Sequence, residues 1–341
     1  MIEIEIERPA PRRSDSPRLI GQTWAIVLAA GDGARLGSLT RDADGYSVPK
    51  QFCSLRAGSS LLHGALRRAE TVVDFARCCA VVAQQHRRWW ARSLCGLPRD
   101  NVITQPQNRG TANGLLLALA YVLERDPLAN VVVLPSDHYV RDEDTLCAAL
   151  LSSVRALRAD EAEIVLLGLV PEDADPELGY IVPSRRAREA PVAVRRFVEK
   201  PAVPEAAALI ADGALWNLFI VAARAQSLLD LLRAKNAFLV ERMRTAWRLD
   251  AHCFTGYSAV ADLYRTLPTL DFSRDVAQGR EAALSVLQVP PCGWSDLGTP
   301  ERVAKALLRL GPVAGGPPAR RAPLCLEERL ARRDAAAAGH V

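Results

Sequence analysis

A glycine-rich turn and a lysine motif are the parts of this chain whose residue types and spacing most clearly predict chemistry. The turn, Ala29 to Leu36, is Ala-Ala-Gly-Asp-Gly-Ala-Arg-Leu, and Pro49-Lys50-Gln51-Phe52 follows a short loop later. An apolar strand pattern from Trp24 to Leu28 leads into the turn, so its backbone N–H groups are expected to face an anion. Arg35 and Lys50 add fixed positive charge. Together these features predict a site for a nucleoside triphosphate.

The use of lysine supports this interpretation. The chain has 43 Lys and Arg residues, of which only four are lysines. Two of these lie in short motifs, Pro49-Lys50-Gln51 and Glu199-Lys200-Pro201, where a compact ammonium can reach a phosphate that a planar guanidinium fits less well. A general bias toward arginine, with these two lysines left by chance, is the alternative.

Composition and charge argue against several classes of protein. A net charge of +4 over 341 residues, with scattered arginines, is too weak to predict nucleic-acid or membrane binding and favours a small anionic ligand. The eight cysteines form no Cys-x-x-Cys pair, and the N-terminus has no apolar stretch typical of a signal peptide. No apolar run approaches the roughly 20 residues that span a bilayer. We therefore expect a cytoplasmic protein in which each cysteine is a small core residue.

The spacing of apolar residues predicts an α/β fold. Short apolar strands are expected at 25–28, 79–83, 102–105, 131–134 and 164–169, separated by helical segments such as 111–125 and 144–158. This alternation is typical of a mainly parallel sheet covered on both faces. Beyond Pro171, strand patterns at 179–182, 192–198 and 215–222 are expected to form the far wall of a cleft. A last strand at 285–289 precedes a helix at 300–310, which a threonine caps.

The same pattern divides the chain into three parts. Residues 1–22 alternate Ile with Glu and then become rich in Pro, Arg and Ser, which favours a mobile arm. Residues 23–311 are expected to form the folded domain, with a nucleotide-binding half at about 23–170 and a second half at about 171–311. Residues 312–341 form a low-complexity tail rich in Gly, Pro, Ala and Arg.

Asp137 and Asp296 are candidate ligands for Mg²⁺. Asp137 follows an apolar strand closely, and α/β sheets bind ligands at the carboxyl ends of their strands. Mg²⁺ prefers one or two carboxylates plus phosphate oxygens, which a nucleoside triphosphate supplies. A helix N-cap or turn role for Asp137, and a turn role for Asp296, are the alternatives. His138 is expected to be structural.

Two common nucleotide-binding fingerprints do not match the glycine turn. Leu36 occupies the third glycine position of the dinucleotide motif, and no Gly-Lys-Ser/Thr follows as in a Walker loop. Gly-x-Gly-x-Arg-Leu followed by Pro-Lys-Gln-Phe instead resembles the signature of the sugar-nucleotide pyrophosphorylases, most closely the mannose-1-phosphate guanylyltransferases. The resemblance implies the nucleotidyltransferase fold: a Rossmann-like three-layer sandwich with a mainly parallel mixed sheet and a small inserted sugar-binding subdomain.

Further segments match this family in the family's own order, from about Trp24 to Leu310. The resemblance implies that the nucleotide is bound by Ala29, Ala30, Gly31, Gly33, Gln105, Asn108, Gly110 and Thr111, with Arg35 and Lys50 as catalytic residues. It implies that the sugar phosphate is bound by Gly179, Glu199, Lys200 and Asn217, which makes 171–311 the sugar-phosphate half. Asp137 and Asp296 take the part of the metal carboxylates.

The reaction that the resemblance implies joins a nucleoside triphosphate, GTP first, to a sugar 1-phosphate, mannose 1-phosphate first, around Mg²⁺ and with release of pyrophosphate. A phosphate monoester with a second pKa of about 6 is already largely ionised at neutral pH, so no general base is needed. The two substrates are the expected partners, and assembly into a homo-oligomer stays open. The C-terminal isomerase domain of bifunctional members has no counterpart after the last motif, so a single reaction is expected.

Two departures from the family pattern leave the sugar open. Leu218-Phe219 follow Asn217 where the family usually has a small residue and glycine, and Phe272-Ser273-Arg274-Asp275 matches its Ser-Ile-Asp segment only in part. One alternative is a pyrophosphorylase that uses UTP, dTTP or ATP with glucose 1-phosphate. The others are a regulatory protein that binds nucleotide sugars without catalysis, and a glycosyltransferase that uses Asp42-Ala43-Asp44 to bind a metal.

Overall fold

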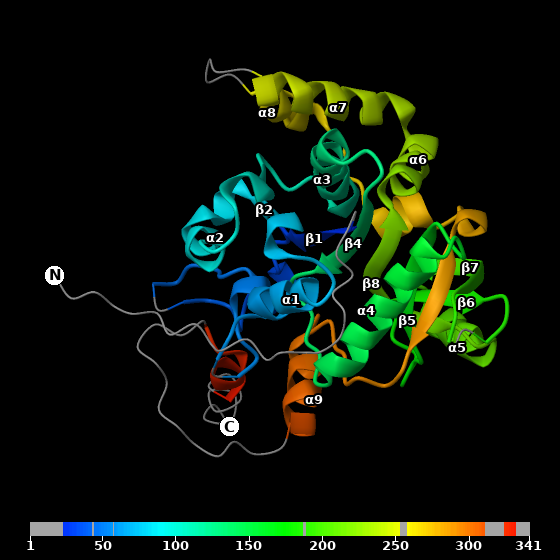
Figure 1. Ribbon diagram of the computed structural model, residues 1–341. Coiled ribbons are helices and arrows are strands. Elements are labelled where there is room, and N and C mark those ends of the chain that lie inside the picture. Colours follow the sequence, from blue (N-terminus) through cyan, green and yellow to red (C-terminus); the bar gives the residue numbers. More distant parts are fainter. Residues whose placement is uncertain are drawn as a thin grey trace.

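A computed structural model describes residues 23–42, 44–56, 58–186, 189–252, 258–310 and 324–331. The N-terminal arm and most of the C-terminal tail expected from the sequence lie outside these residues. The described part is built on a nine-stranded sheet with the order β3-β2-β1-β4-β8-β5-β9-β7-β6 (Figure 1). Its strands are β1 (Thr23–Ala29), β2 (Cys78–Ala83), β3 (Val102–Gln105), β4 (Asn130–Pro135), β5 (Ile164–Leu169), β6 (Gly179–Pro183), β7 (Val192–Glu199), β8 (Leu215–Arg224) and β9 (Ser285–Val289).

The sheet is mixed but mainly parallel, as the sequence predicted. β1 pairs in parallel with β2 and β4, β2 with β3, and β5 with β9. β8 is antiparallel to β4 and β5, and β7 is antiparallel to β6 and β9, so these two strands run against the others. Every residue of β2 and β5 is buried, as expected for strands covered on both faces. The strands of residues 171–311 belong to this same sheet, with β8 between β4 and β5, although the resemblance implied a small inserted subdomain.

Helices cover the sheet on both faces and complete a three-layer sandwich (Figure 1). One apolar cluster joins the sheet to α1, α4, α5 and α9, and the other joins it to α3, α6, α7 and α8. Both clusters contain fully buried aliphatic side chains, so both faces of the sheet are covered. The helices are α1 (Leu61–Glu70), α2 (Arg87–Ser93), α3 (Thr111–Arg125), α4 (Glu143–Arg158), α5 (Val203–Ala211), α6 (Ala225–Lys235), α7 (Ala237–His252), α8 (Ala259–Thr266) and α9 (Pro300–Leu310).

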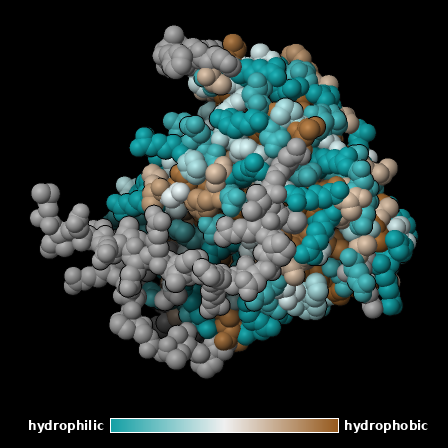
Figure 2. Space-filling model, viewed as in Figure 1, coloured by the Kyte–Doolittle hydropathy of each residue, from teal (hydrophilic) through white to brown (hydrophobic). Residues whose placement is uncertain are grey.

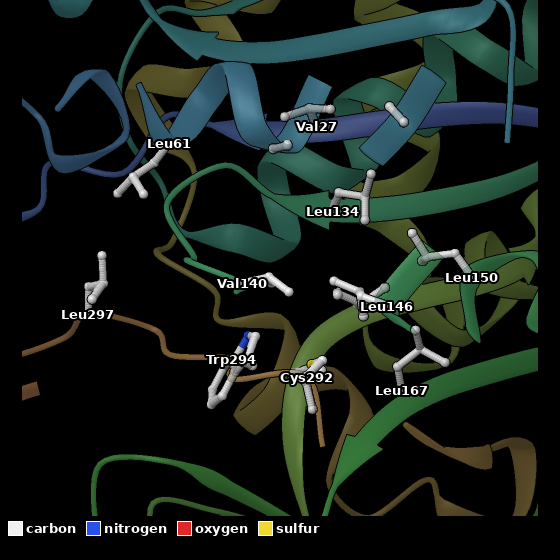
Figure 3. Packing of buried hydrophobic residues seen from close by; sticks show 14 of the residues in the cluster. Val27, Leu61, Leu134, Val140, Leu146, Leu150, Leu167, Cys292, Trp294 and Leu297 are labelled. Atoms are coloured by element: carbon white, nitrogen blue, oxygen red, sulfur yellow. The ribbon is translucent and has the colours of Figure 1, made fainter. Parts of the chain in front are cut away.

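Alternation along the strands divides their side chains between the two clusters. In β1, Val27 faces the cluster with α1 and α4, whereas Ile26 faces the cluster with α3. Figure 3 shows Val27 and Leu134 from the sheet near Leu146 and Leu150 of α4. Trp294 belongs to the same cluster and is buried. The loop after β9 is therefore anchored in the core just before Asp296.

The observed elements agree closely with those expected from the sequence. β3, β5, β9, α3 and α9 have the expected bounds, and other strands gain one to three residues. Thr299 caps α9, because its Oγ1 accepts a hydrogen bond from Arg302 N at 3.3 Å. Burial of apolar faces explains this agreement, since the periodic patterns from which the elements were predicted are the ones that fill the two clusters.

A short stretch of the expected tail, 324–331, packs on the folded domain. Ser54 N donates to Leu324 O, and Leu326 N donates to Ser54 O, each at 2.9 Å. Leu326 is fully buried, and Arg56 pairs with Glu327 at 3.2 Å. This stretch therefore supports the loop that follows Lys50, a contact that its composition did not suggest.

The surface in Figure 2 is mostly hydrophilic, with hydrophobic residues scattered over the view. Among the described helices, none combines the length and the apolar composition needed to cross a bilayer. Most of the described cysteines are buried, and burial raises the pKa of Cys53 and Cys78 to about 12. The expectation that each cysteine is a core residue is wrong for Cys95, which is exposed. Cys147 is only half-buried, and Cys253 lies outside the described residues.

Candidate active site

The candidate site lies where the strand order reverses. The chain moves outward from β1 to β2 and β3 and then returns to β4 on the other side of β1. The segments that follow β1 and β4 therefore separate and leave a crevice at the carboxyl ends of these strands. Ser136 N donates to Leu28 O at 3.1 Å, which ties the two segments together at the base of the crevice. This topology brings the glycine turn close to Asp137.

The glycine turn packs directly on the lysine motif. Gly33 has a φ of +63°, and a Cβ at this position would lie 2.9 Å from the backbone N of Lys50. A side chain here meets both a left-handed backbone and a close backbone neighbour, so glycine fits best. Gln51 Nε2 donates to Ala29 O and to Gly31 O, both at 2.9 Å. The two motifs, separated in the sequence, thus form one unit.

The ammonium of Lys50 occupies the centre of this unit. Lys50 is 5% exposed, and its Nζ lies 2.9 Å from Asp137 Oδ2 and donates to Asp296 O at 2.5 Å. Burial is the largest single effect and disfavours the charged form of Asp137. Attraction to Lys50 and a hydrogen bond from it, together with contributions from His138 and the backbone, outweigh burial and hold the pKa of Asp137 below its usual value. Lys50 therefore holds an ionised carboxylate at the cleft and links it to the loop that carries Asp296.

His138 is neutral and structural, as the sequence predicted. Burial lowers its pKa to about 4. Its Nδ1 accepts a hydrogen bond from Trp294 Nε1 at 3.2 Å, so the ring proton lies on Nε2, 3.8 Å from Asp137 Oδ1. The ring thus joins the carboxylate to the buried loop after β9.

Asp296 lies in the same cleft but is already paired. Both of its carboxylate oxygens accept from Arg302 Nη1, at 2.8 and 2.7 Å, and Arg302 also pairs with Asp175. Leu297, the next residue, has a φ of +47°, a conformation that costs free energy for a residue with a side chain. Sequence reasoning missed Arg302, because nothing in a helix-forming segment marks an arginine as the partner of a carboxylate one loop away.

The predicted site residues converge on one cleft of about 470 Å³. It is lined by Ala30, Gly31, Arg35, Gln105, Asn108, Gly110, Thr111, Asp137, Gly179, Glu199, Lys200, Asn217 and Asp296, among others. Gly33 and Lys50 line a cavity of about 300 Å³ that shares Arg35 and Asp137 with the cleft. Ala29 is fully buried and contributes its carbonyl oxygen to Gln51. The sequence motifs therefore describe one continuous site.

The polar side chains that were predicted to bind the nucleotide form hydrogen bonds with other residues of the protein. Asn108 Nδ2 donates to Asp32 Oδ2 at 3.0 Å, and Asn108 Oδ1 accepts from Gly110 N at 3.0 Å. Thr111 Oγ1 donates to Asp271 Oδ2 at 3.2 Å. Asn108 therefore braces the loop before α3 against the glycine turn, and its amide is engaged at both ends.

Among the residues that were predicted to bind the sugar phosphate, Gly179 leaves space for the side chain of Glu199. The two residues are paired between β6 and β7, and a Cβ on Gly179 would lie 2.5 Å from Glu199 Oε2. Asn217 lies beside them, because the same added Cβ would be 3.3 Å from Asn217 Cβ, and it donates to Ser273 Oγ at 3.4 Å. Lys200, the residue after Glu199, has a φ of +52°. The backbone is therefore left-handed at the point where β7 ends.

Glu177 forms ion pairs with Arg35 and Lys200, the two cations that the sequence analysis assigned to different substrates. Its Oε2 lies 2.7 Å from Arg35 Nη1 and 3.9 Å from Lys200 Nζ. All three side chains are about half exposed, so these pairs contribute little to stability and can be exchanged for phosphate oxygens. Sequence reasoning missed Glu177, since an acidic residue in an exposed loop carries no signal of its own. Gln51, Asp271 and Arg274 also line the cleft without having been assigned.

The residues of the cleft fit Mg²⁺ chiefly through Asp137. Its carboxylate is ionised, lies 37% exposed in the cleft, and is of the oxygen-donor type that Mg²⁺ prefers. Asp296 is 11% exposed, and its oxygens are shared with Arg302. Within the described residues, no three His, Cys, Asp or Glu side chains gather into a metal-binding group, so most ligands of a cation here must come from phosphates or water.

The Asp-x-Asp motif considered for a glycosyltransferase does not reach the cleft. Asp42 Oδ1 accepts from Asp44 N and Tyr46 N, at 3.1 and 2.8 Å, which is a local turn. Neither carboxylate lines the cleft. The geometry thus gives this motif a structural role in the loop after the glycine turn.

Glu199 makes stability depend on pH. Burial, and then repulsion from Asp271, raise its pKa from 4.5 to about 7. The folded chain therefore binds this proton more tightly than the unfolded chain, so the stability of the fold decreases as pH rises from about 4.5 to about 7. Glu199→Gln removes the ionisation, and its melting temperature should rise by a few degrees relative to the native chain across this window. Thermal unfolding followed by circular dichroism at several pH values, with the exposed Glu161→Gln as control, tests this; a pH-independent difference would contradict it.

The fold and the cleft together define a class: α/β proteins with a crevice at the point where the strand order of the sheet reverses. The chain belongs to the nucleotidyl transferase family, whose model matches residues 24–310. The resemblance inferred from the motifs is thereby confirmed.

Individual relatives of the chain support the same family assignment. The chain is 32% identical over 282 residues to the xanthan biosynthesis protein XanB of Xanthomonas campestris pv. campestris, covering 80% of this chain and 57% of that protein. It is 28% identical over 287 residues to a mannose-1-phosphate guanylyltransferase of Escherichia coli K12, covering 81% and 58%. The chain thus spans less than two thirds of the length of these relatives.

Solved structures support the fold. A protein described as a mannose-1-phosphate geranyltransferase from Thermus thermophilus aligns with a TM-score of 0.69 and 29% identity, over 84% of this chain and 79% of that one. A putative glucose-1-phosphate thymidylyltransferase from Bacillus anthracis aligns with a TM-score of 0.53 and 14% identity, over 86% and 98%. The second likeness bears on the fold alone.

Proposed function

We propose that the chain transfers a nucleotidyl group from a nucleoside triphosphate to a sugar 1-phosphate and releases pyrophosphate. The observation that carries this proposal is a single cleft lined both by Arg35 and Asp137, which follow β1 and β4, and by Glu199 and Lys200 at the end of β7. Two phosphorylated substrates repel each other, and a cleft that gathers several cations can hold them together. Membership of the nucleotidyl transferase family supports the same reaction class.

The expected chemistry is attack by an oxygen of the sugar phosphate on the α-phosphorus of the triphosphate. The attacking phosphate is already ionised, so the protein orients it through Lys200 and binds the sugar hydroxyls through Glu199 and Asn217. Arg35 and Lys50 stabilise negative charge on the nucleotide side. Mg²⁺, when held by Asp137, supplies further positive charge to the phosphates. The paired Glu177 must give way to the substrates at Arg35 and Lys200.

GTP and mannose 1-phosphate are the substrates that we propose first. Support comes from the names of relatives, which include mannose-1-phosphate guanylyltransferases. Asn108, in the loop before α3, is held in place by hydrogen bonds with Asp32 and Gly110. A fixed loop of this kind is suited to recognising a base. Each end of the Asn108 amide makes one such hydrogen bond and keeps a second donor or acceptor position for the base.

A matrix of triphosphates against sugar 1-phosphates tests the proposal. GTP, UTP, dTTP, ATP and CTP are each combined with mannose, glucose, galactose and N-acetylglucosamine 1-phosphates, and pyrophosphate is measured. We expect the highest rate with GTP and mannose 1-phosphate. The highest rate with UTP, dTTP or ATP and glucose 1-phosphate would support the other pyrophosphorylases. Binding of nucleotide sugar without pyrophosphate from any pair would favour a regulatory protein.

Lys200→Ala should weaken binding of the sugar phosphate in particular. A hydrogen bond from an ammonium to a phosphate contributes about 1.5–3 kcal/mol, so KM for the sugar 1-phosphate should rise about 10- to 100-fold. KM for the triphosphate should change little. Initial rates with each substrate varied in turn measure this, and the exposed Lys235→Ala on α6 is the matched control. A rise confined to the KM of the triphosphate would show that Lys200 serves the other substrate.

A further inference from the structure

Phe219 has a backbone conformation that suits glycine. It lies in β8 with a φ of +54°, in the left-handed region that disfavours a residue with a Cβ. Its backbone N donates to Asn217 Oδ1 at 3.0 Å, so the conformation is held by a residue of the sugar-phosphate side. Strained residues of this kind persist where the surroundings fix them, and they concentrate at functional sites.

The surroundings of Phe219 belong to the sugar-phosphate end of the cleft. Phe219 lines the cleft and meets the ring of Phe272 edge-on, with centroids 6.2 Å apart. Phe272 follows Asp271 and precedes Arg274, whose charges both act on Glu199. Asn217 in turn donates to Ser273. A phenyl ring therefore stands where the turn after Asn217 meets the segment around Phe272.

The strain at Phe219 comes from its Cβ, which a glycine would lack. A glycine at this position would adopt the same φ freely and would leave the space of a phenyl ring in the cleft. The chain instead keeps a large apolar side chain that is only half-buried, so packing in the core is an incomplete reason for its presence. An aromatic face beside hydroxyl-binding groups is suited to the apolar face of a sugar ring.

We propose that Phe219 limits the size of the sugar that the cleft accepts. Its ring forms a wall beside Asn217, favours unsubstituted hexose 1-phosphates and excludes hexose 1-phosphates with an N-acetyl substituent. The inference rests on the proposed function, because it names the substrate class of that site. It follows from the departure from small residues at 218–219 and from the strained backbone that this departure requires.

Three variants test the role of the ring. Phe219→Gly removes the ring and relieves the backbone, Phe219→Leu keeps an apolar side chain, and Phe238→Ala removes an exposed ring on α7 as the control. The readout is the ratio of kcat/KM for N-acetylglucosamine 1-phosphate to that for mannose 1-phosphate, with GTP. Phe219→Gly should raise this ratio at least about tenfold, a difference of about 1.4 kcal/mol. Phe219→Leu should raise it less, and Phe238→Ala should leave it unchanged.

The outcomes separate this inference from the proposed function. If the native chain forms pyrophosphate from GTP and a hexose 1-phosphate but Phe219→Gly leaves the ratio unchanged, the role of Phe219 is overturned and the function stands. If the native chain forms no pyrophosphate with any pair, the proposed function fails, and the inference fails with it. If Phe219→Gly does not fold, Phe219→Leu decides: a ratio equal to that of the native chain overturns the inference.

Discussion

Asp137→Asn is expected to lower kcat by about 10³- to 10⁵-fold, the range seen when a charge that stabilises phosphoryl transfer is removed. Asp137 is held ionised by Lys50 at 2.9 Å and faces the cleft. The amide keeps the size of the side chain but loses the negative charge that Mg²⁺ requires. The measurement is pyrophosphate release at saturating substrates, over a titration of Mg²⁺, in a variant shown to be folded by circular dichroism.

Asp44→Asn is the matched control for this variant. Asp44 is exposed and belongs to the Asp-x-Asp motif that lies outside the cleft, so its loss should leave kcat within about twofold of the native value. A native-like rate for Asp137→Asn, or a large loss for Asp44→Asn, would contradict the proposed site. A large loss for Asp44→Asn would indicate that the loop after the glycine turn takes part in the reaction.

Lys50→Met is expected to produce a loss of similar size, with kcat reduced about 10³-fold or more. Methionine fills a volume near that of lysine but cannot donate to Asp296 O or pair with Asp137. The variant should therefore lose the charge near the phosphates and also the link between the segments after β4 and β9. The pKa of Asp137 should rise, because the ammonium that holds it down is removed.

A double-mutant cycle shows whether Lys50 and Asp137 act together. Since each side chain positions the other, the double variant should lose about as much activity as either single variant, as groups that act as one unit do. Measured kcat values for the native chain, both single variants and the double variant give this coupling. Losses that multiply would mean that the ion pair at 2.9 Å has no part in catalysis. Lys235→Met, exposed on α6, controls for the loss of a lysine.

The elements of the fold were predictable because they follow short-range patterns. β5 and α3 have the bounds that the periodicity predicted, since burial on both faces of a strand or on one face of a helix leaves a local signal. The packing of 324–331 on Ser54 left no such signal. Its few apolar residues lie in a segment whose composition resembles a tail, and only the surface on which they pack explains their burial.

The motifs of the site were also predictable, but the partners of their side chains were not. Gly33, Lys50 and Asp137 were found from residue type and spacing. Glu177 and Arg302 were missed, although one pairs with Arg35 and the other with both oxygens of Asp296. Ion pairs between residues far apart in the chain depend on how loops pack together, and the sequence around one residue does not indicate its partner.

By itself, then, the amino-acid sequence determined the alternation of strands and helices, the glycine turn after the first strand, and the types of residue available for phosphate and metal binding. These are local properties, set by backbone conformation, burial and side-chain chemistry within a few residues. Only the tertiary structure decided that Lys50 is held between Asp137 and the loop of Asp296, and that Phe219 stands with a strained backbone beside Asn217. Contacts of this kind arise where separate strands end at one edge of a sheet, because the order of the strands brings together residues that are distant in the chain.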